Sequence, residues 1–170
     1  TFDQLTEVLK THSGGIILDL RDNSGGLLQE ASLSASIFTG SNVVLGYRSL
    51  PDGTSSPIMS AQIPNHQLYS YGFDATKEGE EEVIVCLVNQ GTAGVAEFFV
   101  SALKHHSKAV LVGRTTSGEA AEEYIHTLTD QLFLKMADIE LLNPEQKSWN
   151  KVGLKPQVVV YPVDHVSLEG

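Results

Sequence analysis

The chain has 170 residues, of which 41% are hydrophobic and 19% charged, and these proportions are typical of a globular domain rather than of a disordered or fibrous chain. Its formal net charge of −10, from 11 basic and 21 acidic residues, argues against binding to nucleic acid or to an anionic membrane. No apolar run in the sequence is long enough to span a membrane.

The order of predicted elements indicates an α/β fold. Apolar residues at helical spacing predict a first helix, with one face formed by Phe2, Leu5, Val8 and Leu9. The following segments predict a strand at 16–20, a helix at 27–38 and strands at 42–47 and 83–88. The second half predicts a helix at 95–106, a strand at 109–113, one long strand or a bent pair at 132–142, and a closing strand at 157–162. Apolar strands that alternate with helices indicate a largely parallel sheet with helices on both faces.

Residues 48–82 are the least regular part of the chain. They are rich in Pro, Gly and Ser, and they end in an acidic run at 78–82. A connection of this length predicts an irregular insertion or a set of weak strands, and the acidic run is most simply a solvated loop. No internal repeat or second domain is visible, so we treat residues 1–170 as one domain.

The motifs of several common sites are absent from the sequence. There is no GxxxxGK[ST] phosphate loop, and no GxGxxG follows a strand, so a nucleotide cofactor has no support. There is no HExxH motif, and His105 and His106 are adjacent rather than on one helical face, which does not favour a metal site. The absence of GxSxG argues against an α/β-hydrolase elbow. We therefore expect neither a metal ion nor a cofactor.

Two glycine-containing turns each lead from an apolar strand into a helix. In the first, DNSGGLL at 22–28, Gly25 and Gly26 can leave backbone N–H groups uncovered, as an anion or oxyanion site requires. The same pattern is equally consistent with a tight strand–helix turn and no further role. The second turn, at 91–97, presents more amides at a helix N-terminus. If the two turns face each other, they can hold a peptide carbonyl between them.

The residues that form these turns resemble those of a known family. The stretches LDLRDNSGGLL (18–28), VNQGTAGVAEFFVSALKHHSKAVLVG (88–113) and LKMADIELLNPEQKSWNKVGLKPQVVV (134–160) are similar to the core of the C-terminal processing (tail-specific) serine peptidases. The resemblance implies a crotonase-like, Clp-protease-like ββα architecture. It also implies that the usual PDZ domain and the first core strands lie upstream of Thr1 or are missing, so that the chain is a fragment.

The reactive residues of that family are substituted in this chain. The resemblance places the nucleophile, a serine in Ser-Ala-Ser-Ala-Ser, at Gly94. It places the general base, a lysine, at Glu119, which lies 25 residues after Gly94. The glutamine that often follows the lysine by one turn matches Glu123. A Ser–Lys pair needs a hydroxyl that attacks and an amine of lowered pKa that takes its proton. Glycine has no side chain, and an ordinary carboxylate is a weak base near neutrality.

The resemblance implies that the oxyanion turn is retained. Gly25 and Gly26 match the family's turn, and the amide of Val95 is the second donor. Because removal of a serine nucleophile costs about 10⁶-fold in turnover, the expected function is that of a catalytically inactive or very weak homologue. Such a protein keeps a groove for an extended polypeptide or a protein C-terminus, with an upstream PDZ domain or a second chain as a further partner.

Two other functions stay open at this point. The protein can be an active serine endopeptidase with a rearranged site, although Thr92, Ser101 and Ser117 have no base at a convincing spacing, and we expect Thr92 to cap the following helix. It can also carry a small apolar ligand, because interphotoreceptor retinoid-binding modules share this fold. The single Cys86 lies in an apolar strand and is interpreted as inert core. The resemblance implies an extracytoplasmic location, in the periplasm, in a lumen or outside the cell.

Overall fold

The computed structural model describes residues 2–9, 14–62 and 83–161. Its helices are α1 (Phe2–Leu9), α2 (Leu28–Thr39) and α4 (Val95–His106). Its strands are β1 (Ile16–Asp19), β2 (Val44–Ser49), β3 (Ser55–Met59), β4 (Ile84–Val88), β5 (Val110–Gly113), β6 (Ala121–Thr129), β7 (Leu132–Leu142) and β8 (Val158–Val159).

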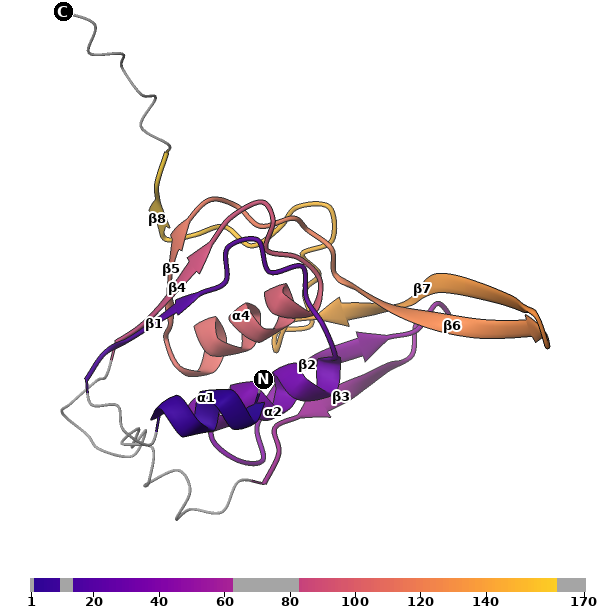
Figure 1. Cartoon of the computed structure of the whole chain (residues 1–170), viewed down its shortest axis with the longest axis horizontal. Coiled ribbons are helices and arrows are strands. Elements are labelled where there is room, and N and C mark those ends of the chain that lie inside the picture. The colour runs from indigo at the N-terminus through magenta and orange to yellow at the C-terminus, as the bar shows by residue number, and fades with distance from the viewer. Residues whose placement is uncertain (1, 10–13, 63–82, 162–170) are drawn as a thin grey trace, which may run out of the picture.

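The strands form two four-stranded sheets that differ in direction. Sheet A has the order β1-β4-β5-β8, and all of its pairings are parallel. Sheet B has the order β3-β2-β7-β6, and all of its pairings are antiparallel. Helix α4 connects the neighbouring parallel strands β4 and β5, as a crossover between parallel strands requires. Figure 1 shows the helices between the two sheets.

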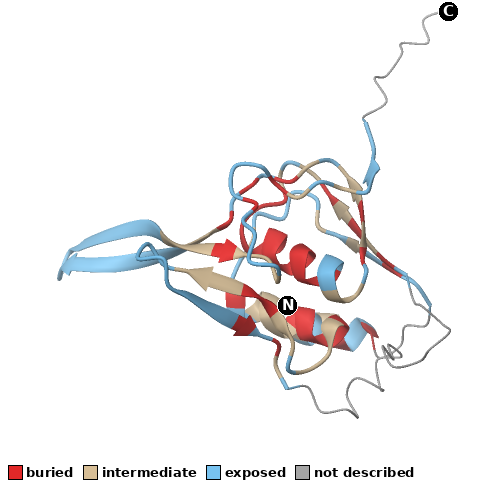
Figure 2. Ribbon diagram, turned by 180° about the vertical axis from the view of Figure 1, so that it is seen from behind, coloured by how far each residue is buried: buried red, intermediate tan, exposed pale blue. Residues whose placement is uncertain are grey.

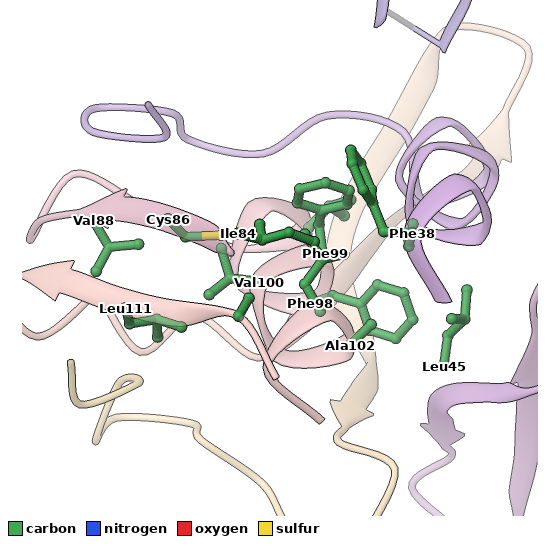
Figure 3. Close-up of a cluster of buried hydrophobic side chains, with 14 of the residues drawn as sticks. Phe38, Leu45, Ile84, Cys86, Val88, Phe98, Phe99, Val100, Ala102 and Leu111 are labelled. Atoms are coloured by element: carbon green, nitrogen blue, oxygen red, sulfur yellow. The ribbon is translucent and has the colours of Figure 1, made fainter. Parts of the chain in front are cut away.

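The core lies where α4 packs on sheet A. Along β4 the side chains of Ile84, Cys86 and Val88 are buried, whereas those between them are only half-buried. Figure 3 shows these side chains directed toward α4, whose Phe98 and Val100 are fully buried. Burial of large apolar side chains on one face of the sheet and around α4, which is buried on all sides from Val95 to Leu103, is the main stabilising contribution to this part of the fold.

Helix α2 completes the core against α4. The ring of Phe38 meets the ring of Phe99 edge-on, with centroids 6.4 Å apart and an interplanar angle of 75°. At the end of α4, Nε2 of His106 lies 2.7 Å from the carbonyl oxygen of Val44 in β2. The helix is therefore tied to both sheets, and its N-terminus has a fixed position between them.

Strands β6 and β7 extend beyond the body as a two-stranded arm (Figures 1 and 2). Most of the arm is exposed, and its exposed apolar side chains include Ile125, Leu128 and Phe133. Only the base of the arm joins sheet B, where Leu142 pairs with Tyr47 of β2. The base of β6 is thus held next to the body, and its outer edge has no neighbouring strand among the described residues.

The predicted α/β class and the parallel sheet with flanking helices are confirmed, but several details differ. The strand predicted at 42–47 belongs to a second, antiparallel sheet. Helices cover one face of sheet A in the described residues, and on the other face Ile17 is 70% exposed. Val8, predicted on the buried face of α1, is 64% exposed. Within the irregular segment, Ser55–Met59 is a strand, and the acidic run at 78–82 lies outside the described residues.

Candidate functional site

Gly94 forms a strained turn at the N-terminus of α4. It is the N-cap residue, with φ 57° and ψ −124°, a backbone conformation that residues with a side chain rarely adopt. A Cβ atom added there would meet only the carbonyl oxygen of Ser24, at 3.6 Å, which is an ordinary contact. The turn therefore has the sharp strand-to-helix form that presents a nucleophile in hydrolases, with open space where a side chain would stand.

Hydrogen bonds lock the two glycine-containing turns together. The amide of Ala93 donates to the carbonyl of Asn23 at 2.9 Å. The side chain of Asn89 donates to Asp22 at 3.0 Å, and its oxygen accepts from the amide of Asp22 at 2.9 Å. Because these bonds join residues more than sixty positions apart, they fix the first turn against the N-terminus of α4.

The close approach of the turns brings backbone amides without an acceptor to the N-terminus of α4. A Cβ atom on Gly25 would lie 3.1 Å from the amide nitrogen of Val95, so the approach requires glycine. The amide of Gly25 itself donates to the side chain of Asn23 at 3.0 Å. In the described parts of the chain, the amides of Gly26 and Val95 have no hydrogen-bond acceptor. The donors available to a carbonyl or carboxylate therefore include those of Gly26 and Val95, and not that of Gly25.

A fully buried carboxylate joins this turn to the loop that carries Glu119. Oε2 of Glu97 accepts from the amides of Gly94, at 3.1 Å, and Glu119, at 2.8 Å. Oε1 accepts from the amide of Gly118, at 2.9 Å, and from the hydroxyl of Thr116. Each of the two carboxylate oxygens accepts two hydrogen bonds. The Glu97 carboxylate therefore fixes the backbone of positions 94 and 119 relative to each other.

A third loop holds the Glu119 loop from its other side. The amide of Lys151 donates to the carbonyl of Gly118 at 2.7 Å, and the amide of Leu154 donates to the hydroxyl of Thr116 at 2.7 Å. The amide of Ser117 donates to the carbonyl of Thr92 at 2.9 Å. The loop is therefore bonded on several sides, so Glu119 is presented on a rigid segment.

A groove of about 510 Å³ lies at the N-terminus of α4, between the first glycine turn and the base of the β6–β7 arm. We call it the central groove. The residues of the predicted site that line it are Gly26, Gly94, Val95, Glu119 and Glu123. The structure thus brings all of the predicted site residues except Gly25 to one groove. Sequence reasoning missed Glu97, for which its position three residues after the N-cap is a signal of a helix start.

Four charged side chains line the central groove, and two of its glutamates have basic partners. Glu122 accepts from the guanidinium of Arg48 at 2.8 and 3.2 Å, and this side-chain hydrogen bond raises the pKa of Arg48 above its ordinary value. Glu123 forms an ion pair with Lys135 of β7. Glu119 is exposed and accepts only from the Ser117 hydroxyl, at 3.3 Å, in the part of the chain that the structure describes.

A second cavity, which we call the apolar pocket, adjoins the central groove across Gly26 and Val95. Its volume is about 350 Å³. Its walls are mainly apolar, and they include Leu5, Leu18, Leu20, Leu27, Ala31 and Phe99. Gly25 lines this pocket rather than the groove. The two unpaired amides thus lie where a polar groove meets an apolar cavity.

The other hydroxyls near the turn lack the partners of a nucleophile. Thr92 was expected to cap α4, but its buried hydroxyl donates to the carbonyl of Leu20 at 2.7 Å. Ser101 is 6% exposed and lies within α4. Ser117 is exposed, and its hydroxyl donates to Glu119. Among the described residues, no lysine or histidine is hydrogen-bonded to any of these three hydroxyls.

The remaining candidates for chemistry are isolated side chains. Cys86 is fully buried, and this burial raises the pKa of its thiol to about 12, so the thiol stays protonated at neutral pH. At the end of α4, Nδ1 of His105 lies 3.9 Å from Oε1 of Glu145. The described residues contain no group of three or more His, Cys, Asp or Glu side chains that could hold a metal ion. No helix in the described segments is long and apolar enough to cross a membrane.

Comparison with known proteins assigns the chain to a family. Residues 1–160 match the model of Peptidase family S41. The chain belongs to peptidase family S41. A probable CtpA-like serine protease of Staphylococcus aureus is 35% identical over 166 residues, which cover 95% of this chain and 31% of that protein. A probable CtpA-like serine protease of Staphylococcus haemolyticus is 29% identical over 164 residues, with the same coverage.

Solved structures of S41 proteases share the fold. The photosystem II D1 C-terminal processing protease superposes with a TM-score of 0.74 at 23% identity, over 95% of this chain and 38% of that one. A putative S41 protease from Bacteroides fragilis superposes with a TM-score of 0.72 at 23% identity, over 93% of this chain and 41% of that one. The predicted fold class is therefore confirmed. The chain spans about a third of the length of the curated S41 relatives that it matches.

Proposed function

We propose that the chain is a non-catalytic or very weakly active S41 homologue that binds an extended polypeptide in the central groove. The observation that carries this proposal is the combination at one groove of two unpaired amides with Gly94 and Glu119. The amides can hold a carbonyl or a terminal carboxylate. Glycine at position 94 supplies no nucleophile, and the exposed carboxylate at position 119 supplies no amine that could act as base.

The edge of the β6–β7 arm provides a further means of binding a peptide. β6 is one of the two outer strands of sheet B, and its Ala121 and Ile125 line the central groove. An extended chain can add to such an edge by backbone hydrogen bonds, with its side chains in neighbouring pockets. A peptide that follows β6 passes beside Gly94 and Glu119, which line the same groove.

In this proposal the residues act as part of a larger protein. Because the chain spans about a third of its curated relatives, we infer that it is one peptidase-like core domain that works with further segments, such as a PDZ domain, or with a second chain. The resemblance to C-terminal processing peptidases supports an extracytoplasmic location and a polypeptide ligand.

A variant that fills the central groove tests the proposed peptide binding. Binding of a fluorescein-labelled, extended nonapeptide to the full chain is measured by fluorescence anisotropy. We expect Ala121→Trp to weaken binding at least about tenfold, because an indole would occupy the groove beside β6. Thr129→Trp, at the far end of β6, is the matched control and should bind as the native chain does. Equal binding by both variants would contradict the proposal.

The apolar pocket favours a second candidate function, the binding of a small apolar ligand. Its volume of about 350 Å³ falls within the range of small-molecule sites, at the lower end, and its walls are mostly aliphatic. A fatty acid could place its chain in the pocket and its carboxylate at the amides of Gly26 and Val95. Native mass spectrometry of the purified protein tests this candidate. A bound lipid that is lost in Ala31→Trp, which fills the pocket, would support it over the peptide.

A further inference from the structure

Glu119 is the one glutamate of the central groove that lacks a basic partner among the described residues. We propose that Glu119 makes the groove selective for peptides with a lysine or arginine side chain, by pairing with that cation in the open space above Gly94. This inference rests on the proposed peptide binding. It gives the residue at the family's general-base position a role in recognition in place of catalysis.

The position of Glu119 is fixed before any ligand binds. Its amide donates to the buried Glu97 carboxylate at 2.8 Å, and the preceding Gly118 is held by both Glu97 and Lys151. The only interaction of its side chain in the described residues is the long hydrogen bond from Ser117, at 3.3 Å. A carboxylate on a rigid backbone loses little conformational freedom when it pairs, so more of the ion-pair energy remains as affinity.

The space above Gly94 can accept the end of a long cationic side chain. A Cβ atom at position 94 would have only the carbonyl oxygen of Ser24 within 4 Å, at 3.6 Å, so the space is open. The same contact places the Ser24 carbonyl at the edge of this space as a second acceptor. Ser24, Gly94 and Glu119 all line the central groove. An ammonium or guanidinium group needs several acceptors, and this corner offers a carboxylate and a carbonyl.

The other charged side chains of the central groove leave its part beside Ser24, Gly94 and Glu119 with a negative charge. Three glutamates and one lysine line the groove, and Arg48 reaches Glu122 from β2. Arg48 and Lys135 neutralise Glu122 and Glu123, so the unpaired carboxylate of Glu119 determines the sign of the groove. The net charge of −10 adds a weak attraction of cationic ligands from a distance.

The test compares matched peptides on the full chain. The host is a fluorescein-labelled nonapeptide of alanine, serine and valine, with lysine moved through its five central positions, and glutamine at the same positions as the reference. We expect at least one lysine peptide to bind about threefold to fivefold more tightly than its glutamine partner at low salt, and this preference should disappear at high ionic strength.

Variants at position 119 assign the preference to one carboxylate. Glu119→Gln should abolish the lysine preference, and Glu119→Lys should invert it in favour of glutamate at the same position. Glu145→Gln removes the same charge outside the groove and should leave the preference unchanged. Circular dichroism confirms the fold of each variant. Equal binding of all peptides to the native chain would overturn the inference and leave the groove intact, whereas binding of no peptide would overturn both.

Discussion

At position 94 glycine fits the unusual backbone conformation of the turn. The conformation of Gly94, with φ 57°, costs a residue with a side chain about 1–3 kcal/mol, which glycine avoids. A Cβ atom at this position would meet only the carbonyl oxygen of Ser24, at 3.6 Å, so the turn has room for a side chain. The turn therefore has a geometry that could present a side chain to the groove, although glycine itself presents no reactive group.

On the proposal that Gly94 and Glu119 occupy the positions of the family's nucleophile and base, introducing serine and lysine there should produce some chemistry. Gly94→Ser with Glu119→Lys in the full chain should raise cleavage of casein at least about a hundredfold over the native chain, because a nucleophile and its base together are worth up to about 10⁶-fold. Each single variant is a control and should stay inactive, since each lacks one partner. Cleavage is measured by release of soluble peptides, with and without a serine-peptidase inhibitor. A folded double variant without activity would mean that the groove has diverged as well.

The buried carboxylate of Glu97 should be the most sensitive residue of the site. Glu97→Gln keeps one acceptor but turns an NH₂ group toward backbone N–H donors that also need acceptors. We expect the free energy of unfolding, measured in urea, to fall by at least about 2 kcal/mol. Glu145→Gln, an exposed carboxylate, should change it by less than about 0.5 kcal/mol. An equally stable Glu97→Gln would contradict the role given to Glu97.

Among the elements, α4 contributes many residues to the hydrophobic core, whereas most of the β6–β7 arm is exposed. Phe98 is fully buried at the centre of α4, and we expect Phe98→Ala to lower the free energy of unfolding by about 3–5 kcal/mol, because it leaves a cavity. Phe133 in the arm is 59% exposed, and Phe133→Ala should cost less than about 0.5 kcal/mol. Urea unfolding measures both. A similar loss in the two variants would mean that the arm is part of the core.

The elements that could be predicted from sequence are those whose burial follows a local period. The helix predicted at 95–106 coincides with α4, since its apolar residues recur at helical spacing. Strand β6 was missed because its side chains from Glu123 to Thr129 are all exposed, so no alternation marks it. The division into two sheets depends on pairings such as that of Tyr47 with Leu142, which lie far apart in the chain and leave no local signal.

The same distinction holds for the site. The turns around Gly26 and Gly94 could be predicted because each is marked by a strand, small residues and a helix in succession. The position of Lys135 in the groove could not be predicted from sequence. It depends on the register in which β7 pairs with β6. The role of Thr92 was predicted wrongly, since its hydroxyl bonds to Leu20 of another segment rather than to its own helix.

At the scale of the whole molecule, the central groove lies where the two sheets approach the N-terminus of α4. Sheet A and α4 hold the turn at Gly94, and sheet B supplies the opposite wall through Ala121 and Lys135. The site is thus built from segments distributed along the chain, and its geometry depends on the complete fold rather than on one motif. A groove that is fixed in this way can bind a ligand without reactive side chains of its own.

The measurement that tests binding without cleavage most directly is the mass of a bound polypeptide. Casein is incubated with the full chain, the complex is isolated by size-exclusion chromatography, and the casein is analysed by mass spectrometry. We expect casein to co-elute with the protein and to keep its full mass after prolonged incubation. Shortened casein whose formation is prevented by a serine-peptidase inhibitor would contradict our conclusion, because it would require a working nucleophile in this groove.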